Sequence, residues 1–121
     1  MSLNDRARHY VLELASEDPT DVLDIVHFFK NRNPALSTDE CIRAAQALVR
    51  SLHSAGLIEF FEDDWTITAV GNRKLTPIVG HKISFYMTNM SFWTPRDQAL
   101  VVRLAISCTE AGKREVFGEL Q

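Results

Sequence analysis

The residue types that most often carry catalysis are scattered along this chain. The four histidines, His9, His27, His53 and His81, belong to no spacing typical of a metal site or of an activated nucleophile. The five glycines are isolated, so the sequence contains no glycine-rich loop that would hold a phosphate. We therefore expect that the protein is not an enzyme and uses no cofactor and no metal.

His27 stands among the apolar residues of a predicted helix. We interpret His27 as a buried histidine with satisfied hydrogen bonds rather than as a ligand. Cys41 lies near the start of a predicted helix, where the helix dipole can activate a thiol. A small buried apolar residue is the favoured interpretation of Cys41.

Arg43, Gln46, Arg50 and Ser54 have the spacing of one outward face of a helix. The helix that would carry them spans about residues 39–55. Its opposite face is an apolar stripe at helical period, formed by Ile42, Ala45, Leu48, Val49 and Leu52. These four polar residues are therefore the first candidates for contact with another molecule.

The stretch from residue 37 to residue 75 has several signals of local structure. Ser37 and Glu40 have the spacing of a capping box, and Gly56 ends the helix as a left-handed cap would. The sequence then predicts a strand over 57–61, an acidic turn over 62–64 and a returning strand over 65–67. Thr68 would cap a short helix over 69–75.

Two further helices are predicted before this stretch. Asn4 would cap a helix over about 5–15. Asp18 and Pro19 would begin a second helix over about 20–30, whose apolar residues point in most directions. We expect this second helix to be the most buried.

The last third of the chain gives mixed signals. Thr76 and Pro77 can begin a helix, which is favoured, but the alternation of apolar and polar residues over 83–88 is typical of a strand. Both interpretations stay open for residues 77–90. Thr94 and Pro95 repeat the start signal. The apolar spacing that follows predicts a helix over about 95–112.

Residues from about 4 to 75 resemble a winged helix-turn-helix domain. The run Leu48–Ile58 resembles the ending "L-x-x-G-L-I" of the third helix in such domains, and Thr68–Gly71 resembles their "Thr-x-x-Gly" opening after the wing. The resemblance implies an α+β, mostly α fold. A winged-helix core of three helices and a two-stranded wing would occupy residues 1–76, and additional C-terminal helices would occupy residues 77–121.

In winged domains that bind DNA, the third helix enters the major groove and the wing touches the backbone. By this resemblance Arg43, Gln46, Arg50 and Ser54 would face the groove of double-stranded DNA. Arginine and glutamine can form bidentate bonds to guanine and adenine. The function implied is that of a transcriptional regulator acting as a dimer. The alternative is that the four residues form only a solvated helix face.

The predicted wing is acidic. Glu59, Glu62, Asp63 and Asp64 would cluster on or beside its tip, where a DNA-binding wing needs lysine or arginine near phosphate. These carboxylates favour an alternative function, that of a winged-helix module that contacts proteins and does not bind DNA.

Large apolar side chains are concentrated in the last third of the chain. A winged-helix core of the predicted size, residues 1–76, usually forms a complete hydrophobic core without such additional side chains. We therefore predict a homodimer interface, with packing back onto the first helix as the alternative. The predicted interface residues are Phe85, Tyr86, Met90, Phe92, Trp93, Leu100 and Leu104.

The composition is that of an ordinary globular protein of 121 residues, with a formal net charge of -3. Its two cysteines, Cys41 and Cys108, form no paired motif, and no apolar run is long enough to cross a bilayer. We expect a cytoplasmic protein that does not contact membranes.

Overall fold

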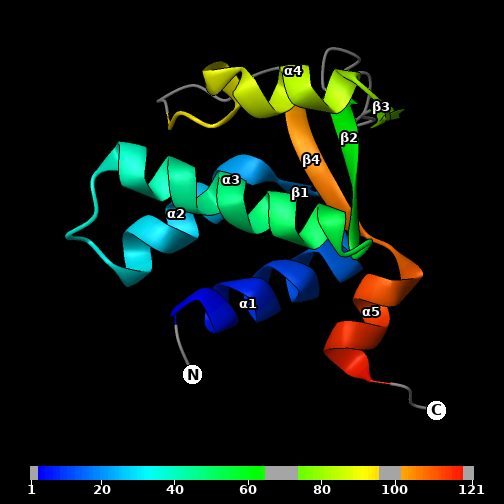
Figure 1. Cartoon of the computed structure of the whole chain (residues 1–121), viewed down its shortest axis with the longest axis horizontal. Helices are drawn as coiled ribbons and strands as arrows, with labels where there is room; N and C mark the ends of the chain where they lie inside the picture. The colour runs from blue at the N-terminus through cyan, green and yellow to red at the C-terminus, as the bar shows by residue number, and fades with distance from the viewer. Residues whose placement is uncertain (1–2, 65–73, 96–101, 119–121) are drawn as a thin grey trace, which may run out of the picture.

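The computed structural model describes residues 3–64, 74–95 and 102–118 (Figure 1). Within these ranges the chain is α+β, with five α-helices and a four-stranded antiparallel sheet. The elements follow one another as α1 (Leu3–Glu17), β1 (Thr20–Asp21), α2 (Val22–Arg32), α3 (Thr38–Ser54), β2 (Ile58–Asp64), β3 (Lys74–Ile78), α4 (Lys82–Thr88), the 3-10 turn η2 (Met90–Phe92), β4 (Val102–Cys108) and α5 (Glu110–Phe117).

The start of α3 confirms the capping box predicted from the sequence. The Ser37 hydroxyl oxygen accepts a hydrogen bond from the Glu40 backbone N–H, and the Glu40 carboxylate accepts one from the Ser37 backbone N–H. These two bonds satisfy donors that a helix start leaves without partners. Gly56 has the left-handed φ of 75° expected after the helix end.

The start of α2 differs from the prediction. Thr20 and Asp21 form the short strand β1, and Asp21 is the N-cap, because its carboxylate accepts a hydrogen bond from the Leu23 backbone N–H. The helix therefore begins two residues later than Asp18 and Pro19 suggested. It is well buried, as predicted, but His27 is exposed, so the prediction of a buried histidine was wrong. Cys41 is buried, as expected.

The predicted hairpin at residues 57–67 has different bounds. The acidic residues 62–64 do not form a turn, because β2 continues through Asp64. The strand that returns along it is β3, in which Thr76 and Pro77 are part of the strand and do not begin a helix. Lys74 and Leu75, expected at the end of a short helix, also belong to β3. The predicted strand at 65–67, and residues 68–73 of the predicted helix, lie outside the described residues.

The helix predicted over residues 95–112 is wrong over residues 102–108, whereas residues 110–112 belong to helix α5. Residues 102–108 form β4, which lies between β1 and β2 in the sheet order β1-β4-β2-β3. The apolar residues of β4 had matched a helical period, yet seven residue pairs join β4 to β2 in antiparallel register, from Ile58↔Cys108 to Asp64↔Val102. Residues 77–121 therefore supply a central strand as well as helices, and a helix is observed for part of the open stretch 77–90, as α4.

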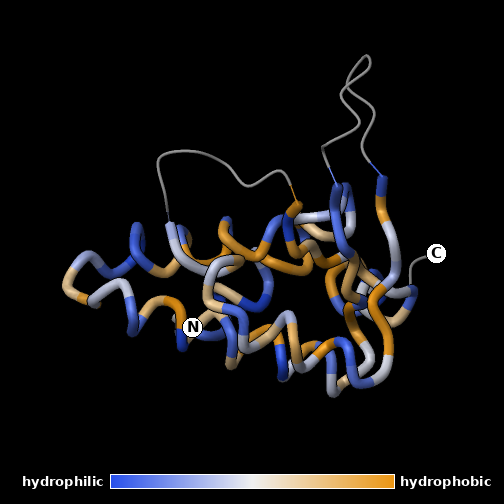
Figure 2. Tube along the Cα trace, turned by 90° about the horizontal axis from the view of Figure 1, so that it is seen from above, coloured by the Kyte–Doolittle hydropathy of each residue, from blue (hydrophilic) through white to orange (hydrophobic). Residues whose placement is uncertain are grey.

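Helices α1, α2 and α3 pack together on one face of the sheet, and their apolar faces form the core with Leu104 and Ile106 of β4. The chain shows the alternation of polar and apolar segments expected of amphipathic helices (Figure 2). Helix α4 runs antiparallel to α3 at one end of the molecule, while α5 packs against α1 at the other end (Figure 1). In the described ranges, no helix has both the length and the apolar character needed to span a membrane.

Candidate nucleic-acid interface

The outward face of α3 carries most of the polar residues singled out from the sequence. Arg43, Arg50 and Ser54 are exposed, whereas Cys41, Ala45, Val49 and Leu52 on the opposite face are buried. Arg43 and Arg50 are seven residues apart, so they lie on the same side of the helix, two turns from each other. The periodicity of the sequence thus identified one continuous exposed face with two guanidinium groups.

The two arginines differ in their surroundings. Hydrogen bonds with Ser37 lower the pKa of the Glu40 carboxyl, and the nearby charge of Arg43 adds to this effect. Within the described part of the chain, Arg50 forms no ion pair. The guanidinium of Arg50 is therefore open to an anion from outside the molecule.

Gln46 is placed differently from the other three candidates. Its side-chain amide donates a hydrogen bond to the backbone oxygen of Met87 at 2.9 Å and lies 3.8 Å from the Met90 sulfur. Met87 belongs to α4, so this amide joins α3 to α4. Gln46 therefore positions α4 in this structure and does not share the open face of Arg43 and Arg50.

Three of the four carboxylates expected at the tip of a wing, those of Glu62, Asp63 and Asp64, are buried or half-buried in strand β2. The hydroxyl of Tyr86, on α4, donates a hydrogen bond to the carboxylate of Glu62. Asp63 is 3% exposed and lies opposite Arg103 of β4, and Asp64 lies opposite Lys74 of β3. Opposite charges facing each other across strands are a stabilising arrangement. Of the four acidic residues, Glu59 alone is exposed.

The Tyr86–Glu62 hydrogen bond predicts a pH-dependent stability. This bond, with a further contribution from burial, raises the pKa of Tyr86 from 10.0 to about 12. A raised folded-state pKa gives stabilisation that is complete below pH 10 and is lost as the pH approaches 12. We expect Tyr86→Phe to lower the free energy of unfolding by about 1 kcal/mol at pH 8, with a smaller difference at high pH.

Urea unfolding of the wild type and of Tyr86→Phe at pH 8 and at pH 11 measures this difference. Tyr10→Phe is the matched control, because it keeps the ring that stacks on Phe28 at 4.4 Å between centroids. Equal stability of Tyr86→Phe and the wild type at both pH values would contradict the assignment.

The residues predicted for a dimer interface do not form one surface. Trp93 and Leu104 are 0% exposed and belong to the core of the single chain. Tyr86 and Phe92 are half-buried and pack against each other. Phe85 and Met90 are 60% and 45% exposed, and Leu100 lies outside the described residues. Of the described residues in that set, Phe85 and Met90 are thus the ones still open to a partner.

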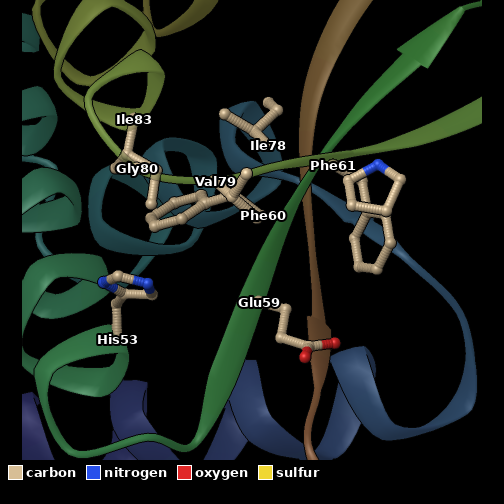
Figure 3. A pocket seen from close by; sticks show the side chains of 9 residues that line it. His53, Glu59, Phe60, Phe61, Ile78, Val79, Gly80 and Ile83 are labelled. Carbon is tan, nitrogen blue, oxygen red and sulfur yellow. The ribbon is translucent and has the colours of Figure 1, made fainter.

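An apolar groove that the sequence did not indicate lies beside α4, with a volume of about 510 Å³. Its walls come from the end of α3, from β2 and β3, and from the start of α4 (Figure 3). His53 and Glu59 are its titratable residues, and Figure 3 shows them on opposite sides of β2. Val79, 70% exposed, borders the groove. Because β3 pairs with β2 only from Phe60 onward, this space depends on strand register and could not be seen in the sequence.

In the described ranges no group of three or more histidine, cysteine, aspartate or glutamate side chains is arranged to hold a metal ion. Comparison with known proteins gives no relative: no family model, no curated protein and no solved structure matches the chain. The geometry of the exposed residues is therefore the basis for a functional assignment.

Proposed function

We propose that this chain is a winged-helix protein that binds double-stranded DNA through α3 and regulates transcription. The observation that carries the proposal is the exposed face of α3, with Arg43 and Arg50 two turns apart and open to solvent. An exposed helix with arginines at this spacing fits the major groove, where arginine forms bidentate bonds to guanine.

The order of elements supports the winged-helix part of the proposal. Three helices with a short strand after the first are followed by β2, and β4 returns antiparallel to β2 in the centre of the sheet. In this proposal β2 and β4 form the wing, and β3 and α4 are an insertion between its two strands. The pairing of β1 with β4 closes the sheet against the helices.

The acidic residues of β2 oppose DNA binding less than the sequence suggested. Glu62 and Asp63 do not project from a wing tip, because Glu62 accepts a bond from Tyr86 and Asp63 is buried. Phosphate binding depends on the charges that reach the DNA, and buried or covered carboxylates oppose it less than exposed ones.

A second candidate function is a protein-interaction module, which the exposed apolar side chains favour. Val79, Phe85 and Met90 are exposed and lie within residues 79–90, the segment that includes α4. Exposed aromatic and methionine side chains are typical of protein interfaces. A homodimer formed by this segment belongs to this second candidate and is compatible with the first.

The test of the proposal is binding to a labelled random-sequence DNA duplex at about 50 mM salt, measured by fluorescence anisotropy. The double variant Arg43→Ala/Arg50→Ala should bind at least about ten-fold more weakly than the wild type, since each lost arginine contact costs about 1–3 kcal/mol. The loss should be larger if the duplex contains a preferred site.

The matched control is Lys113→Ala/Arg114→Ala, which removes the same charge from exposed residues of α5. It should reduce affinity by less than about three-fold, because these residues lie at the other end of the molecule and act only through the net charge. Equal losses in both double variants would show that net charge, and not the α3 face, governs binding.

A further inference from the structure

The segment that covers the acidic strand contains no carboxylate. Residues 74–95 include two lysines, Lys74 and Lys82, and no aspartate or glutamate. Lys74 faces Asp64 across the strand pair, whereas Lys82 is exposed on α4. The element beside the arginine face of α3 therefore presents a net positive surface.

Several contacts fix α4 in this position. Gln46 of α3 binds the backbone oxygen of Met87, and Tyr86 binds Glu62 of β2. The buried Trp93 donates its indole N–H to the backbone oxygen of Tyr86 at 3.2 Å. Because these contacts join α4 to α3, to the sheet and to the core, its position relative to Arg43 and Arg50 is determined by the fold.

Helix α4 lies within reach of one side chain of α3, because the Gln46 amide of α3 donates a hydrogen bond to the backbone oxygen of Met87 at 2.9 Å. The major groove is about 12 Å wide, so an element packed beside a helix in the groove lies over the phosphates that border it. Helix α4 runs antiparallel to α3 (Figure 1), and the Gln46 bond holds it on the side of α3 next to the exposed arginines.

From these observations we infer that α4 is a second DNA-contacting element, in which Lys82 binds a backbone phosphate beside the groove that α3 enters. This inference rests on the proposed function and deepens it. The β3–α4 insertion covers Glu62 with a segment that contains no carboxylate, and its exposed Lys82 adds a positive charge beside α3. The expected ligand of Lys82 is a phosphate of double-stranded DNA, and the contact carries no sequence information.

The experiment measures the salt dependence of duplex binding for the wild type, Lys82→Ala and the control Lys113→Ala. Each phosphate contact contributes about 0.9 to the slope of log K against log salt. Lys82→Ala should reduce the slope by about 0.9 and weaken binding equally for unrelated sequences. Lys82→Glu should weaken binding further, and Lys113→Ala should leave the slope unchanged.

The outcomes separate this inference from the proposed function. If the wild type binds no duplex, both fail. If the wild type binds, Arg43→Ala/Arg50→Ala weakens binding, and Lys82→Ala has the same slope as Lys113→Ala, then the role of α4 alone is overturned. Circular dichroism of Lys82→Ala, which changes an exposed residue, should match the wild type and so exclude unfolding as the cause.

Discussion

Replacing Trp93 by alanine is expected to lower the free energy of unfolding by about 4 kcal/mol, within the range for large buried aromatic residues. Trp93 is the largest of the fully buried side chains in the described ranges. Its removal would leave a cavity next to α4 and would delete the indole hydrogen bond to the backbone of Tyr86. The loss combines transfer of the side chain with the cost of an unfilled cavity.

Urea unfolding at several protein concentrations measures this effect, and Phe85→Ala is its control. Phe85 is also aromatic and predicted for the same interface, but it is exposed on α4. We expect Phe85→Ala to change stability by less than about 1 kcal/mol. A loss below about 1 kcal/mol in Trp93→Ala, or a loss that depends on protein concentration, would indicate an interface role for Trp93 and contradict its place in the core.

Gly112→Ala is expected to destabilise the protein by about 2–3 kcal/mol, as overpacking does. Gly112 lies in the first turn of α5, where a Cβ atom would be 2.1 Å from the Leu57 backbone oxygen and 3.2 Å from the Cys108 sulfur. The Leu57 oxygen also accepts a hydrogen bond from the Thr109 backbone N–H at 3.0 Å. Because backbone atoms oppose the added methyl group, α5 would have to move.

Helix propensity alone predicts that Gly112→Ala stabilises the protein, because alanine is more favourable than glycine in a helix by about 1 kcal/mol. The thermal unfolding of Gly112→Ala therefore decides between local propensity and the close approach of α5 to Leu57. Lys113→Ala is the neighbouring control, and its exposed side chain predicts a change within about 0.5 kcal/mol. An increase in melting temperature for Gly112→Ala would show that α5 does not approach Leu57 as described.

Sequence signals that act within a few residues, such as helix caps, predicted α3 correctly. The Ser37–Glu40 capping box and Gly56 bound α3 correctly, because each acts within a few residues. The exposed positions of Arg43, Arg50 and Ser54 followed from the helical period. The one candidate placed elsewhere, Gln46, binds a residue 41 positions away, and no local pattern contains that information.

Strand β4 shows why the last third was harder to predict. Leu104, Ala105 and Cys108 satisfy a helical spacing, but all three are buried in a central strand with neighbours on both sides. A strand buried on both faces loses the alternation that identifies strands in a sequence. The β-branched residues Val102 and Ile106 were the available signal for a strand.

One feature of the surroundings of Lys82 could be predicted from the sequence. The absence of aspartate and glutamate over residues 74–95 is visible without a structure. What the sequence lacks is the long-range pairing of β2 with β4, which makes β3 and α4 an insertion and places α4 along α3.

The most direct test of the central claim is the affinity of the wild-type protein for a random-sequence duplex across a series of salt concentrations. We expect measurable binding at about 50 mM salt, with log K falling linearly as log salt rises; on a duplex without a preferred site, Arg43, Arg50 and Lys82 would each neutralise a phosphate and give a slope near −2 to −3. Absence of binding at about 50 mM salt, or an affinity that does not change with salt, would contradict the central claim.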